Sequence, residues 1–387
     1  MGDSANGVRE DDISVEVDAF PPMVAFVNTK SGGQKGASLL APLQEVFGAD
    51  RTYDLFGQDP VGPMIGLRKH MGEPGLRVVV AGGDGTVNWV MEVMAKIIEE
   101  SSSPLEWAPV AVLPLGTGND LSRQFHWGHA YLGYDLQRLP KAVAEAPVKM
   151  LDRWRLDVSG GTGESDGWVD QFSKTFINYF GIGVDGKVVS LFEECRKAYS
   201  WLYCCRCMNN AIYGWFGMTY CCRCQPKLSN DYELEIVSAG DGENGGGGVQ
   251  ADGGEARATD NVDIPSSSQG VIILNIQSFM GGVELWRHPD CPATPGDGKL
   301  SVCSVNGPIH LGRIKGNIPC SNADFLAQGQ EVLIRCPKQT KAGSIQAQVD
   351  GEAITLKSPG RYKVTKLSQA AMLDGPITAG PLCDFCC

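Results

Sequence analysis

The sequence has 387 residues, which is more than one hydrophobic core usually serves and therefore predicts two domains. Hydrophobic residues make up 43% and charged residues 20%, a globular balance that excludes a long disordered or fibrous chain. Forty-five acidic against 33 basic residues give a net charge of -12, which argues against a general nucleic-acid-binding protein.

The chain opens with an acidic segment, residues 1–19, that has little to bury and is predicted to be a disordered tail. Residues 20–155 then alternate short apolar runs with segments of helical spacing. The predicted strands are 23–28, 76–81 and 108–113, and the predicted helices are 37–47 and 87–98. Strand, glycine turn and helix in this repeated order predict a three-layer α/β domain with a parallel sheet.

The pattern changes in residues 156–370, which predict a mainly β sandwich domain. Strand-like runs lie at 154–158, 174–180, 232–237, 271–276, 300–305, 331–336 and 345–349. One helical stretch is expected at 188–216, and the glycine-rich segment 239–261 is expected to be a flexible loop without a catalytic role. Residues 371–387 form a tail that ends in cysteines.

Three glycine turns follow three of the predicted strands of the first domain. Glycine lets main-chain N–H groups approach phosphate closely, and each following helix offers its N-terminus to negative charge. The turns therefore predict a cradle for a nucleoside triphosphate, with hydroxyl donors at Ser31, Thr86 and Thr117. The residues expected to bind the nucleotide are Asn28, Ser31, Gly32, Gly33, Gly82, Gly83, Gly85, Thr86, Gly116, Thr117, Gly118 and Asn119.

The spacing of these turns matches neither the Walker loop nor the dinucleotide fingerprint. The segments VAFVNTKSGG (24–33), GGDGT (82–86) and LPLGTGNDLSRQF (113–125) closely resemble the catalytic domain of eukaryotic diacylglycerol kinases. In the second domain NYFGIGVD (178–185), IQSFMGGVELW (276–286) and VDGE (349–352) are similar to the accessory domain of the same family. The resemblance covers residues 21–370.

The resemblance implies a two-domain lipid kinase with its active site in the cleft between the domains. It implies ATP and Mg²⁺ as cofactors, membrane diacylglycerol as the substrate and phosphatidic acid as the product. Only about twenty residues precede the kinase domain, so we expect a minimal form without regulatory zinc-binding modules. A sphingoid-base or ceramide kinase and a catalytically silent lipid-binding scaffold are the alternatives.

Three carboxylates are candidates for the chemistry. Asp84 would orient Mg²⁺ or activate the acceptor hydroxyl, or would cap the helix that begins near Thr86. Glu352 would be the general base, although the Asp350-Gly351 pair that precedes it is also a hairpin signal. Asp120 would bond the backbone of its own helix, or join a carboxylate network with Asp84 and Asp152.

Four basic residues near these motifs have two interpretations. Arg123 and Lys30 could neutralise charge that develops on phosphate, or could be solvated. Arg196 and Lys197 lie where the family carries basic residues, and they could contact substrate or form a solvated helix face.

The fourteen cysteines lie in a long chain without a readable export signal or an apolar span of eighteen residues, so we expect reduced thiols in a cytoplasmic protein. Cys204, Cys207, Cys221 and Cys224 have the spacing of a Zn²⁺ site. The aromatic residues around them fit an S-acylated surface equally well, and plain buried thiols are the third interpretation.

The last residues, Cys383 to Cys387, resemble termini that receive two lipid chains, which would anchor a protein stably. Myristoylation at Gly2 is a weaker possibility, because Asn6 stands where Ser or Thr is preferred. We therefore expect a peripheral protein on the cytosolic face of a membrane, with no nucleic-acid partner.

Overall fold

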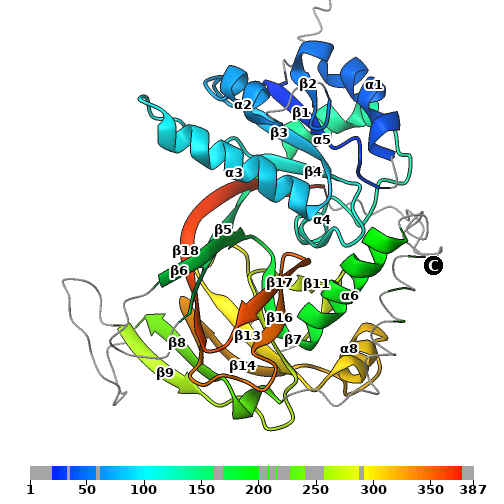
Figure 1. The fold of residues 1–387 in the computed structure, drawn as a ribbon. Helices are drawn as coiled ribbons and strands as arrows, with labels where there is room; N and C mark the ends of the chain where they lie inside the picture. Colours follow the sequence, from blue (N-terminus) through cyan, green and yellow to red (C-terminus); the bar gives the residue numbers. More distant parts are fainter. Residues whose placement is uncertain are drawn as a thin grey trace, which may run out of the picture.

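The computed structural model describes residues 20–32, 35–57, 62–160, 169–199, 227–239, 257–286 and 292–376, with the single residues 208, 212 and 215. Two domains lie one above the other in Figure 1, joined by the long strands β5 (Val148–Gly160) and β18 (Gly360–Leu373). In the part of the chain described, no helix combines the length and the apolar composition that a membrane crossing requires.

The N-terminal domain is built around parallel strands, as the sequence predicts. Its elements are β1 (Met23–Val27), α1 (Lys35–Phe47), η1 (Ala49–Arg51), β2 (Thr52–Asp54), α2 (Met64–His70), β3 (Arg77–Gly82), α3 (Asp84–Glu100), β4 (Val110–Pro114), α4 (Asp120–Gln124), η2 (Leu136–Arg138) and α5 (Leu139–Glu145). The strands stand in the order β2-β1-β3-β4. Every residue of β1 and β4 is buried, because helices cover both faces of the sheet.

The two faces of this sheet have separate cores. Val24 and Phe26 of β1 belong to the cluster that includes residues of α2 and α3. Met23, Ala25 and Val27 belong to the opposite cluster, which includes residues of α1 and α5. This alternation gives three layers, helix on sheet on helix, and confirms the predicted α/β class.

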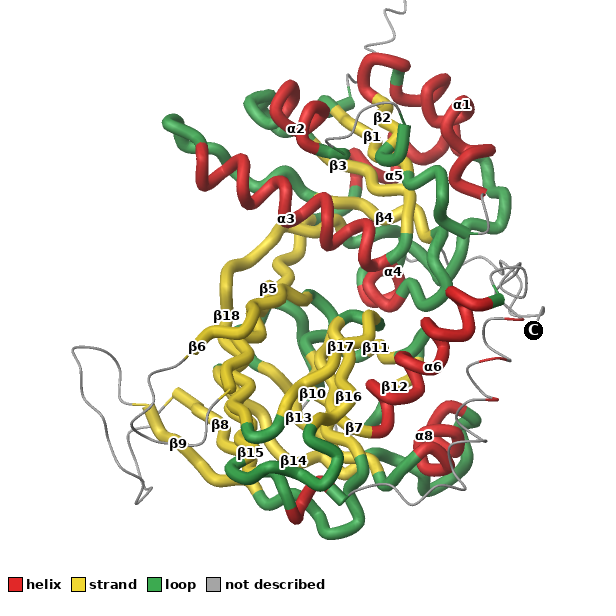
Figure 2. The backbone as a smooth tube through the Cα atoms, in the orientation of Figure 1, coloured by secondary structure: helices red, strands yellow, loops and turns green. Residues whose placement is uncertain are grey.

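The second domain is a sandwich of two sheets. Its elements are β6 (Val169–Phe176), β7 (Tyr179–Gly183), α6 (Val184–Ala198), η4 (Leu228–Asn230), β8 (Glu233–Ala239), β9 (Arg257–Val262), β10 (Gly270–Leu274), β11 (Ser278–Phe279), β12 (Val283–Glu284), β13 (Leu300–Val305), α8 (Pro308–Lys315), β14 (Asp324–Gly329), β15 (Glu331–Cys336), β16 (Ser344–Val349) and β17 (Glu352–Lys357). A six-stranded sheet, β14-β13-β10-β7-β16-β17, packs on the extension β18-β15-β8-β9 of the first sheet through a shared core. The strands dominate the lower half of Figure 2.

Strands β5 and β18 make the connection between the domains. They pair antiparallel over most of their length, with a register shift near Lys366, and Met372 of β18 pairs with Val110 of β4. The expected domain limits at 155 and 370 therefore fall inside strands that both domains share.

Four expected elements need correction. The run 174–180 is not one strand, because β6 ends at Phe176 and β7 begins at Tyr179. The loop predicted at 239–261 contains the first residues of β9, which pairs with β8. The tail predicted to start at 371 begins with the last three residues of β18. The helix predicted at 188–216 begins earlier, with α6 at Val184, and most residues after Tyr199 lie outside the described part.

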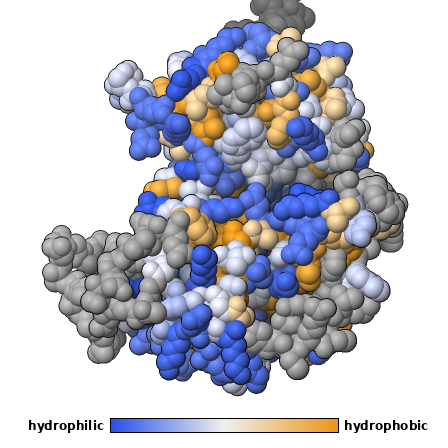
Figure 3. Space-filling model, in the orientation of Figure 1, coloured by the Kyte–Doolittle hydropathy of each residue, from blue (hydrophilic) through white to orange (hydrophobic). Residues whose placement is uncertain are grey.

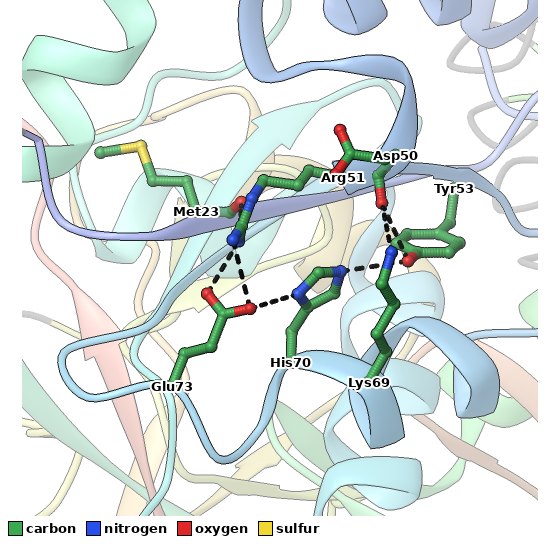
Figure 4. Close-up of polar contacts among 7 residues, drawn as sticks. All are labelled: Met23, Asp50, Arg51, Tyr53, Lys69, His70 and Glu73. Atoms are coloured by element: carbon green, nitrogen blue, oxygen red, sulfur yellow. Dashed lines mark hydrogen bonds and ion pairs between the residues drawn. The ribbon is translucent and has the colours of Figure 1, made fainter.

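A polar network braces the outer edge of the first sheet (Figure 4). Glu73 accepts hydrogen bonds from Arg51 at 2.9 Å and 3.2 Å, and its Oε1 lies 2.6 Å from His70 Nδ1. His70 is almost fully buried, and its Nε2 lies 3.1 Å from the hydroxyl of Tyr53. The bonds from Arg51 hold the pKa of Glu73 below its ordinary value. The network ties α2 to η1 and β2, away from the cleft described below.

Candidate active site

The three glycine turns converge at the carboxyl ends of β1, β3 and β4. A Cβ atom added to Gly116 would lie 2.7 Å from Cα of Gly83, so the second and third turns touch through their backbones. Asn28 Nδ2 donates to Thr86 Oγ1 at 2.8 Å, which ties the first turn to α3. This is the edge of a parallel sheet where ligands bind.

A cleft of about 320 Å³ lies between the two domains at this edge. The first domain contributes Gly83, Asp84, Gly85, Gly116, Thr117, Gly118, Asn119 and Asp120. The second domain contributes Tyr179, Asp185, Val189, Phe192, Glu193, Arg196, Phe279, Met280, Lys315, Gln348, Asp350, Gly351 and Glu352. Figure 3 shows hydrophilic residues gathered along the boundary between the domains in this view.

Several of the other predicted nucleotide residues do not line the cleft. Asn28, Ser31, Gly32, Gly82 and Thr86 are outside the lining, and Gly33 is outside the described residues. Asn119 lines the cleft, but its amide donates to the carbonyls of Gly116 and His129 at 2.9 and 2.8 Å. Its role is therefore to shape the third turn.

Asp84 opens α3 but caps a different helix. Its carboxylate accepts the backbone N–H groups of Asp120 at 2.8 Å and Leu121 at 3.3 Å, the first residues of α4. No side-chain bond from Asp84 caps α3 itself, so the expected capping of the helix at Thr86 is wrong. Burial, followed by the nearby charge of Asp120, raises the pKa of Asp84 to about 7.

Asp120 is buried, and the donors to its carboxylate come from the second domain. They are the hydroxyls of Ser278 and Tyr179 and the N–H groups of Gly281 and Gly282. No described contact joins this carboxylate to the backbone of α4, so the first interpretation of Asp120 is wrong.

Asp152 is not part of the cleft. It is fully buried, pairs with Lys366 at 2.6 Å and accepts the N–H of Gly298 at 2.6 Å. The expected network of three carboxylates is therefore reduced to Asp84 and Asp120.

The hairpin between β16 and β17, which carries Glu352, reaches the cleft from the second domain. Asp350 and Gly351 both have positive φ, 48° and 82°, so the hairpin interpretation of this pair is confirmed. Glu352 follows as the first residue of β17, with its side chain 63% exposed and paired with Lys174 at 2.5 Å. A Cβ atom on Gly85 would meet only Glu352 Oε1, at 4.0 Å. Glu352 therefore faces the start of α3 across the cleft.

Three further carboxylates that line the cleft, Asp185, Asp350 and Glu193, were not predicted. Asp350 accepts three backbone N–H bonds, from Ile177, Asn178 and Tyr179, and burial raises its pKa to about 6. Asp185 is 2% exposed, accepts from Gln348 at 3.2 Å, and burial raises its pKa to about 6 as well. Asp185 ends the motif NYFGIGVD and Asp350 lies in VDGE. The acid in each of these motifs was the signal that could have identified them as site residues.

The basic groups that line the cleft, Arg196 and Lys315, both come from the second domain. Arg196 of α6 lies in the lining, whereas Lys197 is exposed outside it. Lys315 of α8 was not predicted, and burial lowers its pKa. Arg123 donates to the carbonyl of Gly118, while Lys30 lies over the ring of Phe56, 4.3 Å from its centroid. Arg196 and Lys315 are therefore the cations from the second domain that a bound anion would meet.

The described residues contain no group of three or more His, Cys, Asp or Glu side chains arranged to hold a metal. Cys204, Cys207, Cys221 and Cys224, the expected Zn²⁺ ligands, lie outside the described residues.

Solved structures share this fold. A crystal structure of a diacylglycerol kinase from Bacillus anthracis str. Sterne superposes with a TM-score of 0.50, covering 92% of this chain and 98% of that one at 17% identity.

Sequence comparison identifies the family. Diacylglycerol kinase 2 of Arabidopsis thaliana is 32% identical over 91% of this chain, and diacylglycerol kinase theta of Homo sapiens is 30% identical over 89%. The chain spans only 46% and 34% of the length of these two relatives. The diacylglycerol kinase catalytic domain matches residues 22–149, and the diacylglycerol kinase accessory domain matches residues 175–353. The chain therefore belongs to the diacylglycerol kinase family.

Proposed function

We propose that this chain transfers the γ-phosphoryl group of ATP to the free hydroxyl of 1,2-diacylglycerol, giving phosphatidic acid. The observation that carries the proposal is the meeting of Asp84 and Glu352 in one cleft, from opposite domains, beside the turns of Gly83 and Gly116. Phosphoryl transfer needs phosphate donors and an acceptor-side carboxylate held in this relation.

The nucleotide fits the first domain. The turns at Gly83–Gly85 and Gly116–Gly118 offer backbone to phosphates, and α3 begins between them with its N-terminus toward the cleft. Asp84 is the residue that would hold Mg²⁺, because Mg²⁺ on a nucleotide usually takes one or two carboxylates together with phosphates and water. Mg²⁺ bound there would neutralise charge on the phosphates.

The acceptor fits the second domain. Val189, Phe192, Phe279 and Met280 give the cleft an apolar wall that suits the glycerol end of a lipid. Glu352 is exposed and paired with Lys174, so it is available as a carboxylate to accept the hydroxyl proton. Asp185 and Asp350, whose pKa values are near 6, lie on the same side.

Association with the cytosolic face of a membrane is part of the proposal, and α8 supports it. Ile309 is 61% exposed and lies one turn from the exposed Arg313 on this helix, while Lys315 of the same helix lines the cleft. Arg313 has no ion pair among the described residues. An exposed aliphatic side chain one turn from an exposed cation, on a helix that also lines the cleft, suits contact with an anionic lipid surface. The cysteines proposed for lipidation lie outside the described residues.

The test of the activity is transfer of labelled phosphate from ATP to mixed micelles that contain diacylglycerol, ceramide or sphingosine, with NAD as a soluble acceptor. Label in diacylglycerol alone would support the proposal. Label in ceramide or sphingosine would replace it with one of the alternatives, and ATP binding without transfer would favour the silent scaffold.

The test of membrane association is sedimentation with vesicles that contain or lack phosphatidylserine. The double variant Ile309→Ser/Arg313→Ala should lose about tenfold in binding to the anionic vesicles. The matched control is Ile65→Ser/Arg68→Ala on α2, where Ile65 is 48% exposed and Arg68 is exposed. Equal binding by both double variants would remove α8 from the membrane contact.

A further inference from the structure

Asp120 lies in the first domain, but its side chain is hydrogen-bonded by residues of the second domain. It is 1% exposed at the start of α4, directly after the third glycine turn. Every hydrogen bond described to its carboxylate comes from β7, from β11 or from the turn between β11 and β12. The GTGND and SFMGG segments, 160 residues apart in the chain, are thus joined through one side chain.

These donors occupy the carboxylate. Oδ1 accepts from Ser278 Oγ at 2.5 Å and from the N–H groups of Gly281 and Gly282 at 2.9 Å each. Oδ2 accepts from Tyr179 Oη at 3.1 Å and shares the N–H of Gly281 at 3.1 Å. A carboxylate offers about four lone-pair sites, so four donors leave little capacity for a metal ion or for a proton from substrate.

The turn that Asp120 holds is packed closely against the first domain. Gly281 and Gly282 have φ values of 87° and 101°, and a Cβ atom on Gly282 would lie 2.8 Å from the guanidinium of Arg123. Phe279, at the end of β11, and Met280, in the same turn, form part of the apolar wall of the cleft. The position of this wall relative to the phosphate turns therefore depends on the Asp120 contacts.

The main chain of Asp120 contacts the first domain, whereas its side chain contacts the second. Its N–H donates to Asp84 Oδ2 at 2.8 Å. One residue thus links Asp84, beside the phosphate turns, to the turn that lines the acceptor side. Such a link transmits a displacement of one side of the cleft to the other.

We propose that Asp120 is a positioning residue that clamps the β11–β12 turn to the phosphate turn and so sets the distance between nucleotide and lipid acceptor. This inference rests on the proposed kinase function. It separates Asp120, whose carboxylate is filled by four donors, from Asp84, whose carboxylate accepts two described bonds. Loss of the clamp misplaces the lipid acceptor, whereas the nucleotide still binds to the glycine turns of the first domain.

The first measurement needs no catalysis. Hydrogen exchange of residues 278–286 is compared in the wild-type chain of 387 residues and in Asp120→Asn, Ser278→Ala and Tyr179→Phe. The matched control is Asp374→Asn, because Asp374 is also a buried, hydrogen-bonded carboxylate of the first domain but lies outside the cleft lining. The three clamp variants should exchange this segment at least about tenfold faster, and the control should not.

The second measurement is steady-state kinetics with diacylglycerol micelles. Asp120→Asn should lower kcat about 100-fold and Ser278→Ala about tenfold, with the KM for MgATP within about twofold of wild type. Ser278 is not among the residues that line the cleft, so its variant tests the clamp even if Asp120→Asn folds poorly.

Two results would overturn the inference. One is unchanged exchange of residues 278–286 in the clamp variants. The other is a KM for MgATP raised about tenfold in Asp120→Asn with normal kcat in Ser278→Ala, which would make Asp120 a metal ligand. A wild-type chain that transfers no phosphate would refute the kinase function, and the exchange measurement would then decide the clamp alone.

Discussion

The two walls of the cleft differ in what they present to a ligand. The first domain presents mainly backbone, at turns whose glycines Gly83 and Gly116 touch, with the carboxylate of Asp84 at the start of α3. The second domain presents side chains, with the acids Asp185, Asp350 and Glu352 beside the cations Arg196 and Lys315. Backbone donors suit a phosphate chain that is the same in every cycle, whereas side chains can select the acceptor. Substitutions on the two walls should therefore change different kinetic constants.

The largest effect is expected at Asp84, where the walls meet. Asp84→Ala should lower turnover at least about 1000-fold, because it removes the candidate Mg²⁺ ligand. It should cost only about 1 kcal/mol of stability, because the carboxylate also caps α4. The measurements are phosphoryl transfer and thermal unfolding, and an active variant would remove Asp84 from the mechanism.

A smaller effect is expected on the second wall. Glu352→Gln should lower kcat about 100-fold and leave the KM for ATP within about twofold, because a general base acts on the acceptor alone. Lys174→Ala is the control, since it removes the ion-pair partner and keeps the carboxylate. If Glu352→Gln retains full kcat, another carboxylate such as Asp350 must accept the proton.

A substitution in the glycine turns of the first domain should change the KM for ATP rather than kcat. Gly116→Ala places a Cβ atom 2.7 Å from Cα of Gly83, so the turns must separate. We expect the KM for ATP to rise about tenfold or more, with weaker effects on the lipid KM. Gly312→Ala in α8, where a Cβ atom would meet nothing within 4 Å, should be neutral or slightly stabilising.

The smallest effect concerns pH. Asp84, Asp185 and Asp350 have pKa values raised to about 7, 6 and 6, so the folded protein holds more protons than the unfolded chain between about pH 4 and 7. Stability without ligand should therefore fall as pH rises through this window, lowering Tm by roughly 5 °C. Asp84→Asn should flatten the upper part of this curve. A Tm that rises from pH 5 to 7 in the wild type would contradict the raised pKa values.

Sequence reasoning identified the elements that local chemistry specifies. The apolar runs at 23–28, 76–81 and 108–113 became β1, β3 and β4, since strands covered on both faces need an unbroken apolar sequence. Edge elements were missed. Strand β2 has only three residues, and β17 carries just one fully buried residue, so neither has a strong pattern.

The partners of the acids could not be predicted in the same way. Asp84 and Asp120 stand in almost identical settings in the chain, each beside a glycine turn and at the start of a helix. One caps a neighbouring helix, whereas the other accepts bonds from Tyr179 and from residues 278–282 of the second domain. Asp152, the third acid of the expected network, is held by Gly298 and Lys366 outside the cleft.

The sequence by itself determined the family, the α/β and β-sandwich classes and the three glycine turns, because spacing and local backbone preference are written in neighbouring residues. The tertiary structure alone decided which carboxylates face the cleft, which pKa values rise, and that Asp120 joins the two domains. These properties depend on burial and on donors supplied by distant segments. Such contacts exist only after β5 and β18 have brought the second domain against the first.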